Sequence, residues 1–93
     1  MCMALIVHFA PKNMDQDKYA EVLRRLDAAG AGSPPGRLHH TSYGPKDALR
    51  VTDLFDTPQN FEAFGKVLVP ILGSLGIDLG KPEVVEVHNV IRG

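Results

Sequence analysis

The chain has no tryptophan, one cysteine and almost no net charge. The single cysteine, Cys2, excludes an internal disulfide and favours a reducing, cytoplasmic setting. Ten Lys and Arg residues against eleven Asp and Glu residues give a net charge of −1. Nucleic acids and anionic membranes both attract proteins with a surplus of positive charge, so neither is an expected partner.

Long apolar runs are also missing. The apolar stretch over residues 1–7 has no basic residue before it, and His8 and Pro11 cut it short. A secretory signal needs a basic lead and a longer apolar run, and a membrane helix needs roughly 18 or more apolar residues. The stretch therefore predicts a buried β-strand, and neither a targeting segment nor a membrane segment is expected.

Length and composition predict one globular domain over residues 1–93, because 44% of the residues are apolar and 23% are charged. Apolar periodicity and helix-capping residues predict six elements. Strands are expected over 3–9, 37–43, 48–56 and 83–91, and helices from Asn13 or Asp15 to about Ala29 and from Pro58, capped by Thr57, to Leu75. Pro70 lies inside the second helical pattern and predicts a kink or a break near residue 69.

This β-α-β-β-α-β order predicts an α+β fold of the ferredoxin-like type, in which two helices cover one face of a four-stranded antiparallel sheet. Short connections and right-handed crossovers give the strand order 4-1-3-2. The second and third strands then form an antiparallel hairpin around a turn at 44–47.

The sheet face that the helices leave bare is also apolar. Val85, Val87 and Ile91 share one face of the fourth strand, and the first strand is apolar on both faces apart from His8. Monomers rarely tolerate a large exposed apolar patch. We therefore expect a homodimer that packs through this face, with a cover of long loops as the alternative.

Residues 51–64, VTDLFDTPQNFEAF, form a strand that ends in an aromatic, an acidic residue and threonine, followed by a helix with two aromatics three apart. This pattern resembles the dimeric α+β barrel superfamily, which includes the antibiotic-biosynthesis, quinol and haem-degrading monooxygenases. It resembles most closely the small bacterial members of unknown role. The shared features are Tyr19, His40, the strand end Asp53-x-Phe55, Pro82-Glu83-Val84 and Val87-His88-Asn89.

The resemblance implies a dimeric α+β barrel with room for a ligand between helices and sheet. Haem-degrading relatives carry an axial histidine on the second helix, and the segment from Pro58 to Leu75 has no histidine. Their strand-end tryptophan is Phe55 here. Haem degradation is therefore disfavoured, and no cofactor is expected.

His40 and Asp53 form the sharpest candidate catalytic pair. A turn centred on Pro45 and Lys46 places His40 opposite Val51. A turn shifted by a residue pair places His40 opposite Asp53. In both registers the side chains of His40 and Asp53 lie on the same face of the hairpin. A carboxylate beside an imidazole favours the imidazolium and fixes its tautomer, as a general base requires. The alternative is a satisfied polar pair within the sheet or at the dimer interface.

Further candidates are aromatic or polar side chains that would contact a substrate. These are His8 and Tyr43, which would orient it, and Phe55, Phe64 and His88, which would line its cavity. The alternative places the phenylalanines in the core and His88 at the surface. Tyr19 has two interpretations. Its hydroxyl orients the substrate, or the residue is the amphipathic end of the apolar stripe of the first helix.

A metal site is not expected. His39 and His40 are neighbours on a strand, so their side chains face opposite ways and cannot bind one ion together. A zinc site needs three or four converging ligands, and no such set is evident in the sequence.

These observations favour a small-molecule enzyme that resembles the cofactor-independent monooxygenases and binds an aromatic or polycyclic substrate between sheet and helices. The alternatives are a non-catalytic, small-ligand-binding or stress-related accessory homodimer, and a purely structural interaction module. An enzyme requires a cavity lined by the imidazole of His40. A binding protein requires the cavity without converging acid and base groups, and a structural module requires a filled core.

Overall fold

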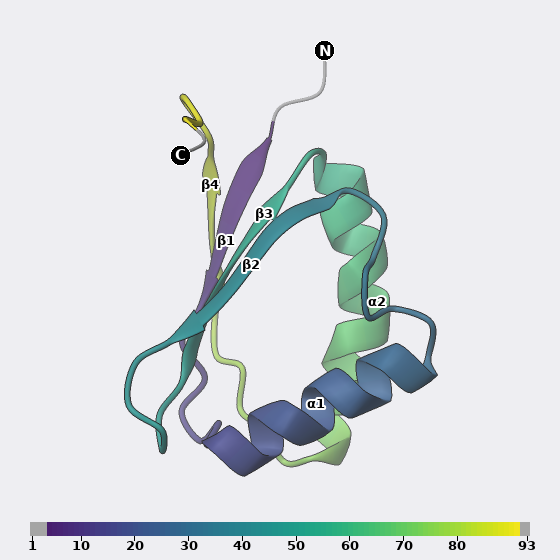
Figure 1. Cartoon of the computed structure of the whole chain (residues 1–93), viewed down its shortest axis with the longest axis vertical. Coiled ribbons are helices and arrows are strands. Elements are labelled where there is room, and N and C mark those ends of the chain that lie inside the picture. The colour runs from purple at the N-terminus through teal and green to yellow at the C-terminus, as the bar shows by residue number, and fades with distance from the viewer. Residues whose placement is uncertain (1–3, 92–93) are drawn as a thin grey trace.

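Four antiparallel strands form a single sheet, and both helices lie on the same side of it (Figure 1). The computed structural model describes residues 4–91, so Cys2 and Met3 lie outside the described residues. In chain order the elements are β1 (Leu5–Phe9), α1 (Gln16–Ala28), β2 (Arg37–Tyr43), β3 (Arg50–Phe55), α2 (Pro58–Ser74) and β4 (Glu83–Glu86). The strand order β2-β3-β1-β4 is the predicted order 4-1-3-2 read from the other edge, so the predicted α+β topology is confirmed.

The core lies between the sheet and the helices and follows from alternation along the strands. Leu5, Val7 and Phe9 of β1 are buried, whereas the intervening Ile6 and His8 are only half-buried on the opposite face. The helices close the core with Val22, Leu26, Phe64, Leu68 and Leu72. Within the described residues, no helix combines the length and the hydropathy that a membrane span requires.

Both helices begin at side-chain caps. Asp15 accepts a hydrogen bond from the backbone N–H of Lys18 at 2.8 Å, and Thr57 accepts one from Asn60 at 3.1 Å. Asp15 is therefore the cap of α1, and the other predicted candidate, Asn13, has a different role. Its side chain bonds Gly76 and Asp78 beyond α2, which ties the start of one helix to the end of the other.

Two elements differ from the prediction. Helix α2 continues past Pro70 to Ser74, so of the predicted kink or break, the break does not occur. Pro70 is exposed, which allows water to reach the carbonyl that its ring leaves without a donor. Strand β4 ends at Glu86 instead of residue 91, and one backbone hydrogen bond follows it, from the N–H of Val87 to the carbonyl of Ala4 at 2.9 Å.

Gly36 leads into β2 in a conformation and a space that suit only glycine. Its φ angle is +82°, in the left-handed region that L side chains rarely adopt. A Cβ atom there would meet the Asp56 carboxylate and would lie 2.7 Å from Cβ of Asn60. The Gly36 carbonyl also accepts a hydrogen bond from the Asp56 backbone at 2.9 Å, so the start of β2 sits tightly against the start of α2.

We expect Gly36→Ala to lower the free energy of unfolding by about 3 kcal/mol, since it combines backbone strain with a steric clash. Gly30→Ala is the matched control, because Gly30 has a φ angle of +77° but no atom within 4 Å of the added Cβ. The control should lose about 1 kcal/mol. Urea unfolding measures both, and equal losses would show that the space around Gly36 is not tight.

Candidate functional site

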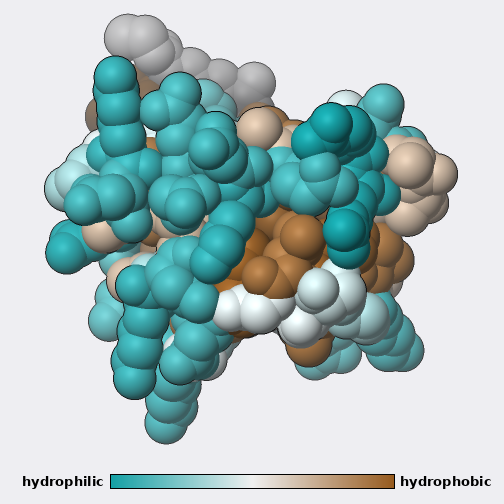
Figure 2. Space-filling view, turned by 90° about the horizontal axis from the view of Figure 1, so that it is seen from below, coloured by the Kyte–Doolittle hydropathy of each residue, from teal (hydrophilic) through white to brown (hydrophobic). Residues whose placement is uncertain are grey.

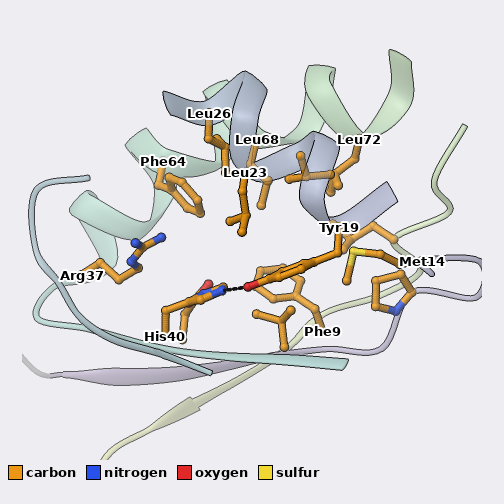
Figure 3. Close-up of a pocket in the computed structure, with 15 residues that line it drawn as sticks. Phe9, Met14, Tyr19, Leu23, Leu26, Arg37, His40, Phe64, Leu68 and Leu72 are labelled. Atoms are coloured by element: carbon orange, nitrogen blue, oxygen red, sulfur yellow. Dashed lines mark hydrogen bonds and ion pairs between the residues drawn. The ribbon is translucent and has the colours of Figure 1, made fainter. Parts of the chain in front are cut away.

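A small cavity of about 40 Å³ lies between the sheet and the helices. Most of its lining is aliphatic or aromatic, and the four polar side chains that reach it are Tyr19, Arg37, His40 and Asp53 (Figure 3). Seen from the side on which α1 lies, apolar surface is recessed within a frame of hydrophilic side chains (Figure 2). Phe64 also lines the cavity, as predicted.

His40 and Asp53 are directly opposed on β2 and β3. The Nδ1 atom of His40 lies 2.5 Å from Oδ1 of Asp53. The Asp53 residue is 2% exposed, so its carboxylate lies inside the protein rather than in solvent. The predicted pairing of these two side chains is confirmed, and it occurs on the face of the sheet that lines the cavity.

Asp53 fixes which nitrogen of His40 carries a proton. A carboxylate only accepts hydrogen bonds, so Nδ1 of His40 donates to it. Nε2 is then free to accept, and the hydroxyl of Tyr19 lies 2.7 Å from it. The hydrogen bonds therefore run in one direction, from Tyr19 to His40 to Asp53.

Tyr19 ends the apolar stripe of α1 and also contacts the histidine. The rings of Tyr19 and His40 are nearly parallel, with an interplanar angle of 2° and centroids 6.1 Å apart. Nothing in the sequence pairs Tyr19 with His40, since the two are 21 residues apart and meet only through the placement of α1.

Backbone hydrogen bonds between the start of α1 and the hairpin loop set that placement. The N–H of Gln16 donates to the carbonyl of Lys46 at 2.8 Å, and the N–H of Leu49 donates to Met14 at 2.9 Å. The same hairpin carries His40 on one strand and Asp53 on the other. These bonds therefore fix the position of Tyr19, one turn into α1, relative to His40 and Asp53.

Farther along α1, Arg25 links the two helices. Its guanidinium donates to the hydroxyl of Ser74 on α2 at 2.7 Å and to the carboxylate of Glu21 at 2.9 Å. The hydrogen bond from Arg25 is the main reason that the pKa of Glu21 lies below its ordinary value, and the charge of Arg24 acts in the same direction. These groups lie at the surface, where such pairs contribute little to stability.

His8 and Tyr43 lie on the opposite face of the sheet from His40. On β1, Val7 is paired with Asp53 and the next residue, His8, is paired with Thr52. Side chains alternate between the two faces along a strand, so the side chain of His8 faces away from the cavity. The hydroxyl of Tyr43 lies 2.9 Å from Nδ1 of His8. The structure thus brings these two predicted residues together, but not beside His40, where they were expected to orient a substrate.

Two other predicted residues lie away from the cavity wall. Phe55 is fully buried beneath it and packs against Phe61 and Phe64, with ring centroids 5.5 and 5.7 Å away. His88 is exposed beyond the end of β4. Within residues 4–91, no three His, Cys, Asp or Glu side chains lie close enough to hold a metal ion.

Arg37 is the cavity residue that sequence reasoning missed. Strict alternation from His40 would turn Leu38 toward the cavity and Arg37 away from it. A β-bulge between Arg37 and His39 reverses this: Arg37 is paired with Phe55 and lines the cavity, while Leu38 is 51% exposed. No feature of the strand's apolar pattern marks this bulge.

No family model and no curated protein matches the chain, but solved structures do. A candidate antibiotic biosynthesis monooxygenase from Chloroflexus aurantiacus aligns with a TM-score of 0.63 and 18% identity over 99% of this chain and 98% of that one. SnoaB, a cofactor-independent oxygenase from Streptomyces nogalater, aligns with a TM-score of 0.63 and 12% identity over 98% and 97%. A protein of unknown function from Nitrosomonas europaea aligns with a TM-score of 0.61 and 16% identity over 99% and 94%.

The chain has the antibiotic biosynthesis monooxygenase-like fold. This confirms the fold that residues 51–64 and the other shared features indicated. One fold hosts many activities, so the monooxygenase-like fold leaves the function to be argued from the cavity.

We expect the His40–Asp53 pair to show strong energetic coupling in a double-mutant cycle. His40→Ala leaves a buried carboxylate without its partner, which costs about 3 kcal/mol, and the double variant should lose about 2 kcal/mol less than the sum of the single variants. The control cycle is His8→Ala with Thr52→Ala, a histidine and a hydroxyl 3.3 Å apart on the other face. Its coupling should stay below about 0.5 kcal/mol, and additive losses at His40 and Asp53 would contradict the assignment.

Proposed function

We propose that this protein is an enzyme that removes a proton from a phenolic, aromatic substrate in the cavity, so that the resulting anion reacts directly with oxygen. One observation carries the proposal: the hydroxyl of a phenol, the side chain of Tyr19, lies 2.7 Å from Nε2 of His40, while the carboxylate of buried Asp53 lies 2.5 Å from the other ring nitrogen. A substrate phenol that takes the place of the Tyr19 hydroxyl would meet a base aimed at its proton.

Besides the substrate and O₂, the chemistry requires only groups that this chain supplies. His40 takes the phenolic proton at Nε2, and Asp53 stabilises the imidazolium and keeps the ring oriented. The apolar lining excludes water from the reacting anion. The anion supplies the electrons for reduction of O₂: one oxygen atom enters the product, and the other leaves as water with the two hydrogens that the substrate loses.

A substrate must widen the cavity to bind. A volume of about 40 Å³ holds only a few water molecules. Leu23 lines the cavity and is 41% exposed, so it stands at the boundary with solvent. Displacement of Tyr19 and Leu23, both on α1, would expose His40 and admit an aromatic ring.

A second candidate is a small-ligand-binding protein without catalysis. It is supported by the hydrogen bonds of His40, because both ring nitrogens already have a partner within the chain. In that case an aromatic ligand fills the apolar part of the cavity and leaves Tyr19 in place.

We also propose that the protein is a homodimer through the bare face of the sheet. Val85 on β4 is 48% exposed on this face, and Val90 and Ile91 beyond it are 49% and 83% exposed. A hollow of about 330 Å³ lies beside them, with Ile6 and Leu54 in its wall. A second copy related by a two-fold axis would fill the hollow and cover the apolar patch.

His40→Ala and Asp53→Asn should each lower kcat for oxygen uptake with naphthols, anthrols or quinols by at least about a hundredfold, because each removes part of the base. His39→Ala is the matched control, since this neighbouring histidine on β2 faces away from the cavity, and it should change kcat less than about twofold. Uptake that survives in both site variants would overturn the proposal. Binding of these compounds without any uptake by the wild type would favour the second candidate.

Val85→Lys should convert the dimer to a monomer, because it places a charge within the apolar interface. Val69→Lys on α2 is the matched control, at a site that is 56% exposed and lies on the helical side. Sedimentation equilibrium at micromolar concentration distinguishes them. A monomeric wild type, or equal behaviour of the two variants, would contradict the proposed interface.

A further inference from the structure

Arg37 places a positive charge at the wall of a cavity whose lining is mostly apolar. Its guanidinium has five N–H donors, and within the described residues it makes one side-chain hydrogen bond, from Nη2 to the carbonyl of Gly32 at 2.9 Å. It forms no ion pair with any acidic side chain in residues 4–91. Asp53, the acidic side chain that lines the same cavity, is paired with His40.

The bulge in β2 brings this charge and the base onto the same face of the sheet. The partners of Arg37 and His40 on β3 are Phe55 and Asp53, which are two residues apart. At about 3.4 Å per residue, the two positions on β2 are separated by roughly 7 Å along the strand. Figure 3 shows Arg37 and Tyr19 on opposite sides of His40, so the guanidinium and the hydroxyl of Tyr19 do not compete for one place.

The side chain of Phe64 extends from α2 toward these polar groups. The guanidinium carbon of Arg37 is 5.9 Å from the centre of the Phe64 ring. An aromatic ring in the cavity would contact the same phenylalanine, and it would carry one substituent toward Arg37 and another toward His40. The polar side chains of the wall are Arg37 and the hydrogen-bonded set of Tyr19, His40 and Asp53, and the rest of the lining is apolar.

From this arrangement we infer that the protein selects aromatic ligands that carry an anionic group at Arg37 as well as a hydroxyl at His40. A planar carboxylate matches the fork of a guanidinium, and such charge-assisted pairs are strong where water is partly excluded. The simplest probe of this arrangement carries the two substituents on opposite ends of one ring, as in para-hydroxybenzoate. The binding of the ligand's hydroxyl at His40 rests on the proposed function, whereas the binding of its anionic group rests on Arg37 alone.

Arg37 also has a structural contact, since it holds the loop before β2 through Gly32. Loss of that contact would weaken the binding of every ligand to a similar extent. A role in selection predicts something different: replacement of Arg37 changes the ratio of affinities between a charged ligand and its neutral analogue.

The test compares three probes by calorimetric titration: para-hydroxybenzoate, its uncharged analogue para-hydroxybenzamide, and salicylate, whose hydroxyl and carboxylate are neighbours on the ring. The wild type should bind para-hydroxybenzoate about tenfold more tightly than either of the other probes. The preference should shrink as salt is added, because an ion pair at a cavity mouth is screened.

Arg37→Gln should remove the preference for para-hydroxybenzoate and leave the affinity for the benzamide within about twofold. Arg37→Lys, which keeps the charge but loses the planar guanidinium, should retain part of the preference for para-hydroxybenzoate. Arg50→Gln is the control, because it removes an exposed arginine at the start of β3 that does not line the cavity.

Equal wild-type affinities for the benzoate and the benzamide would overturn the inference, as would a preference that survives Arg37→Gln. Binding of neither probe at millimolar concentration would also overturn it. The titrations require no turnover, so they separate this inference from the proposed function. A charge preference that depends on Arg37 in a protein without oxygen uptake would support the inference and refute the oxygenase.

Discussion

A carboxylate buried in the middle of the sheet is the constraint on which the site depends. Asp53 lies on β3, between β1 and β2, and is 2% exposed. Burial of an unpaired charge there would cost several kcal/mol. The imidazole of His40 removes that cost, and in doing so it fixes the register of β2 against β3, the tautomer of the histidine and the direction in which Nε2 points. The place of Tyr19 follows, because its hydroxyl donates to the nitrogen that remains.

The sheet carries two histidine–tyrosine pairs on opposite faces, and their third partners distinguish them. His40 and Tyr19 are completed by the carboxylate of Asp53, whereas His8 and Tyr43 are completed by the hydroxyl of Thr52. A threonine hydroxyl is neutral and stabilises an imidazolium much less than a carboxylate does. Only the pair inside the cavity therefore has the composition of a general base.

Alternation and turn chemistry predicted much of this arrangement. The pairing of His40 with Asp53 required only that the hairpin be regular between them, and it is regular there. The caps at Asp15 and Thr57 were readable because both lie directly before helical patterns. Arg37 was not readable, because the bulge that turns it inward breaks the alternation from His40 and has no mark in the apolar pattern of the strand. The contact of Tyr19 with His40 was also hidden, since it depends on backbone bonds between two loops.

The bulge has a further effect that concerns solubility. β2 is an edge strand of the sheet, and an unbroken edge offers its free backbone groups to strands of other molecules, which leads to aggregation. The irregular spacing at Leu38 interrupts that row of donors and acceptors. At the other edge, Pro82 stands before β4, and Glu83 and Glu86 add negative charge to it. Both edges of the sheet thus disfavour strand-by-strand growth into fibres. Neither edge feature blocks the association of two molecules through the face of the sheet.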